Sequence, residues 1–258
     1  MRTYNAFILA GGLCPWLKAL RDTDCRALAL INGKYMLSYI IEALQQSGRV
    51  NKIVVAISPD AIAEAQRVLP QDVIICAAEG DMPTTAYAAA QALKADANEM
   101  LLSVCDDIPL LTAEAIQSFL AQCESEGYAG ADVYYPIIPQ LECLKLYPEA
   151  KRTYGKLTDG SFTGGNIMLL NNAVITQKQQ LGKEIFALRK SPLKLASWLG
   201  WSFIFKAVFH LLSVKAAEQR VSEILDAKCR AIITPHAAIG MDVDKPADLE
   251  LIEKYLSK

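Results

Sequence analysis

The chain has 258 residues, 52% of them hydrophobic, and a formal net charge of −2. This length can bury a substantial core in one α/β domain, whereas the slightly acidic balance leaves no basic field for a nucleic-acid partner. The seven cysteines are scattered and contain no CxxC pair, which favours reduced thiols and a cytoplasmic protein over a disulfide framework or a zinc site.

Strand-length apolar runs alternate with helical patterns through the first half of the chain. The apolar run at 6–10 is too short for a signal peptide and predicts a first strand. Further strands are predicted at 52–57, 72–77 and 100–105, helices at 35–46 and 84–94, and helix caps at Asp60 and Thr112. This alternation predicts right-handed βαβ units, and therefore a mostly parallel sheet with helices on both faces.

The pattern loosens beyond residue 131. Strands are predicted at 131–138, 166–170 and 230–234, a polar and loop-rich stretch at 139–162, and a C-terminal helix that begins at Pro246. We therefore predict a single α/β domain over 1–258 with a three-layer αβα, Rossmann-like architecture and a helical insertion near 185–225.

The helical insertion contains an apolar run, 193–212, that approaches the length of a membrane span. Lys206 lies well inside this run, and a charge there costs about 2.5–3.5 kcal/mol on insertion, so no span is predicted. Gly200 is expected to divide the run into two shorter helices. The aromatic residues are too many for a solvated surface: Trp198, Trp201, Phe203, Phe205 and Phe209. We expect them to cover the protein's own core or a second subunit of a homodimer, and the alternatives are a wall beside a bound ligand or weak contact with an anionic membrane.

Four glycine-rich or acidic segments fall at the ends of predicted strands, where a doubly wound sheet binds its ligands. They are Gly11-Gly12, Asp106-Asp107, 160–166 and Asp242-Val243-Asp244. Glycines let backbone N–H groups approach a phosphate, and two aspartates after a buried strand favour a hard cation such as Mg²⁺. Asp242 and Asp244 are two residues apart, so in an extended segment they face the same side.

Each of these segments also has a plain structural interpretation. Gly11-Gly12 and 160–166 are compatible with turns, Asp106-Asp107 with a solvated strand end, and Asp244 with a helix N-cap. Taken singly, none of the four decides between a structural role and ligand binding.

Taken in order, the segments resemble the MobA-like NTP transferases, which are nucleotidyltransferases with a nucleotide-diphospho-sugar transferase fold. The residues that carry the resemblance are Leu9-Ala10-Gly11-Gly12, Arg26-Ala27-Leu28, Gly33-Lys34-Tyr35, Asp107-Ile108-Pro109-Leu110-Leu111-Thr112 and Asp242-Val243-Asp244-Lys245-Pro246-Ala247-Asp248-Leu249. Their order and spacing match the family pattern across about 1–125 and 160–258.

The resemblance implies a site for an NTP and a small phosphorylated acceptor. It implies Mg²⁺ or Mn²⁺ on Asp107 with Asp244 or Asp242. It also divides the domain into a nucleotide-binding half, 1–125, and an acceptor-binding half, 126–258. Nucleotide contacts are expected from Leu9, Ala10, Gly11, Gly12, Glu79, Gly80, Thr84, Thr85 and Asp106, acceptor contacts from Gly164, Gly165 and Asn166, and catalytic charge from Arg26, Lys18 and Lys34.

The sequence departs from the family pattern in the glycine-rich loop. Trp16 stands at the position of the family's arginine and cannot neutralise phosphate charge, and Arg26 replaces the usual lysine. The chain is therefore identified as a divergent member, expected to transfer an NMP group to a sugar phosphate, polyol phosphate or cofactor precursor with Mg²⁺-dependent release of pyrophosphate. The alternatives are a catalytically impaired nucleotide-binding protein and a GT-A-type glycosyltransferase, and the base and the acceptor are left open.

Overall fold

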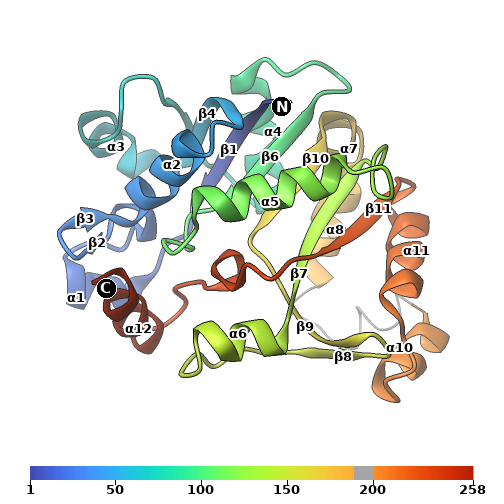
Figure 1. The fold of residues 1–258 in the computed structure, drawn as a ribbon. Helices are drawn as coiled ribbons and strands as arrows, with labels where there is room; N and C mark the ends of the chain where they lie inside the picture. Colours follow the sequence, from blue (N-terminus) through green and yellow to red (C-terminus); the bar gives the residue numbers. More distant parts are fainter. Residues whose placement is uncertain (189–199, 258) are drawn as a thin grey trace.

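In the part of the chain that the structure describes, residues 1–188 and 200–257 of a computed structural model, nine strands form one sheet (Figure 1). In spatial order they are β5 (Ile74–Ala77), β4 (Val50–Ile57), β1 (Tyr4–Ala10), β6 (Met100–Cys105), β10 (Ile167–Asn171), β7 (Val133–Pro139), β9 (Gly160–Gly164) and β8 (Gly155–Leu157), with β11 (Cys229–Ile233) also paired to β7. Of the nine described strands in this sheet, only β9 and β10 run against the direction of the others. The mostly parallel α/β sheet that the sequence predicts is therefore confirmed.

The first strand explains why helices cover both faces of the sheet. Successive side chains of a strand point to opposite faces, and Ile8 packs in the cluster of α2 (Met36–Gln46), α3 (Ile62–Val68) and α5 (Ala113–Glu124). Its neighbour Phe7 packs on the other face with α4 (Met82–Leu93) and α7 (Asn172–Gln177). Both residues are fully buried, so the sheet is the middle of three layers.

A bend between β9 and β10 carries polar backbone toward the carboxyl end of β6. Gly165 and Asn166 separate the two strands, which both pair antiparallel with β7. Cys105 N donates to Asn166 O at 2.9 Å, and Asn166 N donates to the carbonyl of Ile239 at 2.9 Å. Asn166 is thereby held against the end of β6 by two other segments.

Short elements surround the carboxyl ends of the central strands. They are α1 (Pro15–Arg21), the turns η1 (Arg26–Leu28), η2 (Pro59–Ala61) and η3 (Ala237–Gly240), the hairpin β2 (Leu30–Ile31) and β3 (Lys34–Tyr35), α6 (Gln140–Leu146) and α12 (Pro246–Leu256). Buried Leu17 of α1 packs in one cluster with Leu249 and Ile252 of α12. This contact joins the segment after β1 to the C-terminal helix, which begins at Pro246 as predicted.

The helical insertion contributes α8 (Gln179–Leu188), α10 (Trp201–Val208) and α11 (Val214–Leu225) to the described structure. Gly200, with φ of 95°, immediately precedes α10, whereas Trp198 lies outside the described residues. The ring centroids of Phe205 and Phe209 lie 4.4 Å apart, yet these residues are 59% and 58% exposed. These two rings therefore do not cover the protein's own core. That they contact a second subunit, a bound ligand or a membrane surface stays a prediction. Among the described residues, no helix is both long enough and apolar enough to cross a membrane.

Local capping predictions had different outcomes. Thr112 caps α5, because its Oγ1 accepts from Ala115 N at 3.2 Å. The predicted cap at Asp60 is wrong: that residue lies inside η2, and α3 follows Ala61 with no side-chain cap. The predicted loop at 139–162 is also wrong in part, since it holds α6, β8 and β9. The helix buries only Cys143, and the hairpin is stabilised by pairing with β7, so neither has a strong local pattern.

Candidate active site

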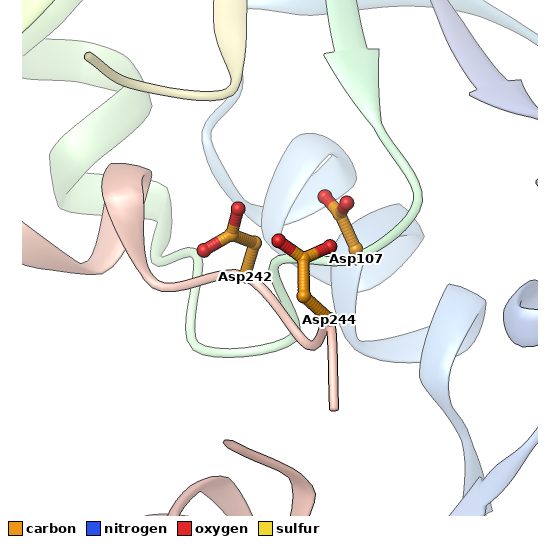
Figure 2. A group of neighbouring side chains, drawn as sticks. All are labelled: Asp107, Asp242 and Asp244. Atoms are coloured by element: carbon orange, nitrogen blue, oxygen red, sulfur yellow. The ribbon is translucent and has the colours of Figure 1, made fainter. Parts of the chain in front are cut away.

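Three carboxylates from two distant segments meet near the carboxyl end of β6. One carboxylate oxygen from each of Asp107, Asp242 and Asp244 lies within 4.8 Å of the others, and the three side chains stand side by side (Figure 2). Asp107 is buried, the Asp242 side chain is partly buried, and the Asp244 side chain is mostly exposed. Like charges at this separation repel, so the cluster is suited to a cation held between its oxygens.

The buried residue between two of these aspartates explains their direction. Val243 is fully buried, and its N–H donates to the carbonyl of Asp107 at 2.9 Å. Because the Val243 side chain points into the core, the side chains on either side of it leave toward Asp107. This is the same-side arrangement that the spacing of Asp242 and Asp244 predicts.

Arg26 contacts the acidic cluster from η1. Its Nη2 and Nε donate to Asp106 Oδ1 at 2.6 and 3.2 Å, and its Nη1 lies 3.0 Å from Asp107 and 3.6 Å from Asp244. Asp106 is completely buried, so the two-point contact with a guanidinium stabilises a carboxylate that water cannot reach. Gly12 leaves room for this guanidinium, because a Cβ there would lie 3.2 Å from Arg26 Nη2.

The electrostatics of the cluster favour a divalent cation. Burial raises the pKa of Asp107 to about 7, Arg26 opposes the shift, and the three neighbouring aspartates add to it. Burial also raises the pKa of Asp244, and Asp242 adds to that shift. Asp107 Oδ1 is buried and has no hydrogen-bond partner in the described part of the chain. A buried carboxylate oxygen without a partner, beside two further carboxylates, is a donor set that suits Mg²⁺, so the residues present fit this ion.

A cavity of about 500 Å³, hereafter the first cavity, opens beside the cluster. Its volume is in the range of small-molecule sites. Its lining comes from the ends of β1 and β6, from η1, from the start of α4 and the turn before it, from the bend between β9 and β10, from α8 and from the segment before α12. The lining residues are Leu9, Gly11, Gly12, Arg26, Ala78, Gly80, Asp81, Met82, Thr85, Cys105, Asp107, Asn166, Phe186, Asp242 and Asp244. Gly11 permits a close approach here, because a Cβ would lie 2.7 Å from that of Ala78.

Comparison with known proteins identifies the family of the chain. The family model of the MobA-like NTP transferase domain matches residues 6–164, which is more than half of the chain. The chain belongs to this MobA-like family. A solved structure described as a hypothetical transferase from Thermus thermophilus is 31% identical, with a TM-score of 0.81 over 96% of this chain and 100% of that one.

Two further matches, one curated protein and one solved structure, are named for reactions of nucleotides. The 3-deoxy-manno-octulosonate cytidylyltransferase 2 of Hydrogenovibrio crunogenus is 28% identical over 107 residues, and this match spans 41% of the chain and only 43% of that relative. A solved structure of CMP:2-keto-3-deoxy-manno-octonic acid synthetase in complex with CTP has a TM-score of 0.64 at 14% identity, over 99% of this chain and 98% of that one. At that identity it shows the fold alone, which is the nucleotide-diphospho-sugar transferase fold that the sequence predicts.

Most of the residues expected to form the MobA-like site line the first cavity. They are Leu9, Gly11, Gly12, Arg26, Gly80, Thr85, Asp107, Asn166, Asp242 and Asp244. The side-chain nitrogen Nδ2 of Asn166 is buried without a hydrogen-bond partner among the described residues, so it is a donor still to be satisfied. Their contacts with ligands stay predictions.

Several expected nucleotide residues lie outside the cavity lining of this MobA-like domain. Ala10 and Asp106 are completely buried, and Glu79 is exposed. Thr84 belongs to the cap of α4, because its N–H and hydroxyl donate to Asp81 Oδ1 at 2.9 and 2.5 Å. Asp106 contacts Arg26, which lines the first cavity, and Thr84 lies in α4, whose first turn also borders it.

The two expected acceptor glycines serve close packing. A Cβ on Gly165 would lie 2.6 Å from Ile239 Cγ2, and a Cβ on Gly164 would overlap the hydroxyl of Tyr135. Both glycines therefore let the bend that carries Asn166 fit against its neighbours. Of this expected group, Asn166 is the residue that reaches the cavity.

Arg26 is the expected cation that the structure brings to the carboxylates. Lys34 lies on β3, pairs with Glu42, and stands 4.3 Å above the ring of Tyr39. Lys18 is exposed on α1. Both lysines lie outside the lining of the first cavity, so their catalytic role stays a prediction without geometric support.

Sequence reasoning missed two residues at the edges of the site. Phe186 reaches the first cavity from α8, because that helix packs on α4, with Gly182 against Pro83. Arg152 pairs with Asp242 from the loop before β8. Neither residue belongs to a motif, and each reaches the site through contacts between segments far apart in the chain.

Proposed function

We propose that this chain is a nucleotidyltransferase that transfers an NMP group from an NTP to a small phosphorylated acceptor and releases pyrophosphate. The observation that carries the proposal is the cluster of Asp107, Asp242 and Asp244 at the wall of a ligand-sized cavity, with Arg26 beside it. Membership of the MobA-like family supports the same reaction class.

The reaction needs positioning and charge neutralisation more than a covalent nucleophile. An acceptor oxygen forms a bond to the α-phosphorus, and the bond from that phosphorus to the bridging oxygen breaks, with its electron pair leaving on pyrophosphate. The backbone at Gly11 and Gly12 is suited to approach the phosphates closely, and the fixed guanidinium of Arg26 to neutralise negative charge on them. Thr85 and the turn at Gly80 would border the nucleoside.

A divalent cation, Mg²⁺ or Mn²⁺, would be held by Asp107 with Asp242 and Asp244. When bound, it supplies positive charge to the phosphate oxygens near the reacting phosphorus. The protein contributes the rigid backbone of β6 and the bond from Val243 to Asp107, which hold the three carboxylates ready for the ion.

The proposal is tested in two steps. A thermal-shift panel of NTPs with and without Mg²⁺ identifies the nucleotide, with CTP first because the curated relative is a cytidylyltransferase. Pyrophosphate release is then measured against a library of sugar phosphates, polyol phosphates and 3-deoxy-manno-octulosonate. A metal-dependent shift followed by acceptor-dependent pyrophosphate release supports transfer. Release of a nucleoside diphosphate from a nucleotide sugar would identify a glycosyltransferase instead.

A second candidate is nucleotide binding without turnover. Trp16 stands where the family has an arginine and packs against the cluster of α1 and α12, so that position offers no charge to a triphosphate. A metal-dependent thermal shift without pyrophosphate release from any acceptor would favour this candidate. The Trp16→Arg variant then tests the cause, since a gain of release would assign the loss to that position.

A further inference from the structure

A second cavity also borders the aspartate cluster. It measures about 280 Å³ and is formed by the loop 150–153, Thr163 of β9 and the first turns of α12. Asp242 and Asp244 line both cavities, so they form the wall between them. A ligand in this second cavity would therefore lie next to whatever the aspartates hold.

Three cationic side chains line the second cavity. Arg152 is mostly buried and pairs with Asp242, but its Nε is buried without a hydrogen-bond partner in the described structure. Lys245 Nζ lies 3.7 Å from Asp248 Oδ1, a long and partly exposed pair, which is therefore weak. Lys151 is exposed and has no ion pair among the described residues. The cavity is thus lined by a mostly buried guanidinium and by an ammonium group that has no ion pair in the described part of the chain.

The charge balance of the second cavity depends on the shared wall. Its lining carries these three cations and three carboxylates, Asp242, Asp244 and Asp248. Once Asp242 and Asp244 hold a divalent cation, the balance becomes positive. An anion then gains from the guanidinium, the two ammonium groups and the ion together, and oxygen-rich anions such as phosphate suit a guanidinium best.

We propose that the second cavity binds a phosphate group, with Arg152 as its main protein contact and Lys151 and Lys245 as supporting charges. The source of this phosphate group rests on the proposed function. In an in-line transfer, two anionic groups lie next to the transferred NMP unit. One source is the phosphate of the acceptor, and the other is the leaving pyrophosphate. Both present the same phosphoryl oxygens to the cavity.

The test measures anion binding directly. Inorganic phosphate and, separately, pyrophosphate are titrated by calorimetry into the full chain with Mg²⁺ present. Arg152→Gln should weaken binding about tenfold or more, because a charged two-point contact is lost. Arg230→Gln is the matched control: Arg230 lies on β11, pairs with Glu218 at 3.3 Å, and borders neither cavity. It should bind both anions like the wild type.

A second variant protects the test against misfolding. Arg152→Gln leaves Asp242 without its partner, whereas Lys151→Gln combined with Lys245→Gln keeps that pair intact. The double variant should weaken phosphate binding about fivefold through lost charge alone. The proposal is overturned if both variants bind either anion with the affinity of the wild type. It is also overturned if the wild-type chain binds neither anion in the presence of Mg²⁺.

A nucleotide analogue separates the two sources. With a saturating non-hydrolysable CTP analogue, phosphate binding that persists and still depends on Arg152 assigns the cavity to the acceptor. If the analogue prevents the binding of both anions, the second cavity is assigned to pyrophosphate. If the wild type binds no NTP analogue of any base, the proposed function fails, while the titrations without nucleotide still decide whether the phosphate site exists.

Discussion

The two cavities differ in how the chain builds them, although they share a wall. The first cavity is lined in large part by segments that directly follow parallel strands, such as Gly11-Gly12 after β1 and Asp107 after β6. The second is assembled from a loop, a strand end and the start of α12. Strand ends at one sheet edge bring their residues together by topology, whereas the second cavity depends on contacts with no common pattern. Changes at the shared wall should therefore affect both cavities, and changes deep in one should affect that one alone.

The largest effect is expected at Asp107, because its loss would weaken the metal site that lies beside both cavities. Asp107→Asn removes a buried carboxylate from the metal cluster. Mg²⁺-dependent NTP binding should fall about 100-fold, or about 2.7 kcal/mol, and anion binding in the second cavity should lose its Mg²⁺ dependence. Calorimetry measures both, with Asp226→Asn as control because Asp226 pairs with Lys178 on the surface. Unchanged NTP affinity in Asp107→Asn would remove this residue from the metal site.

Arg26 should distinguish the cavities. Arg26→Lys keeps one charge but cannot reach both Asp106 and Asp107, as the guanidinium does. NTP affinity should fall about 30-fold and NMP affinity much less, because the lost contact is to the outer phosphates. We choose lysine because alanine would leave Asp106 buried without a partner. Equal losses of NTP and NMP affinity would assign Arg26 a structural role. An equal loss of phosphate affinity in the second cavity would show that the two cavities do not bind their ligands independently.

The pH dependence of metal binding should follow Asp107. Its pKa in the fold, about 7, lies above the unfolded value of about 3.9, so the folded chain binds the extra proton between these values and loses stability as pH rises through them. Mg²⁺ needs the carboxylate, so its affinity should rise about tenfold from pH 6 to pH 8. Mg²⁺ titrations across this range measure the effect. The slope should flatten in Asp107→Asn, and a slope that survives in that variant belongs to another group.

Phe186 should give the smallest effect and sharpen the boundary of the first cavity. Phe186→Ala removes an apolar part of the wall that α8 supplies, and we expect about fivefold weaker NTP binding with no change in phosphate binding. Phe205→Ala is the control, because that ring is exposed on α10. Identical NTP affinities for wild type and Phe186→Ala would mean that the helical insertion takes no part in nucleotide binding.

Local patterns alone were enough for the sheet and for much of the first cavity. Apolar runs separated by helical periodicity predict β1, β4 and β6, because a strand buried on both faces needs continuous apolar residues. Asp106-Asp107 after such a run stand out, since burying carboxylates is costly unless a partner repays the cost. Local patterns did not predict the exposure of the Phe205 and Phe209 rings or the elements at 139–162, because the surroundings of these residues are set by other segments.

What the amino-acid sequence determined by itself is therefore the order of the central strands and of the helices between them, the sheet edge where glycines and aspartates gather, and the same-side direction of Asp242 and Asp244. These follow from periodicity and solvation, which act over a few residues. Only the tertiary structure decided that Arg26 contacts Asp106 and Asp107, that Arg152 contacts Asp242, and that Phe186 reaches the first cavity. Each of these contacts joins segments tens of residues apart, and the chain adopts them only when the whole core is packed, so no short stretch of sequence records them.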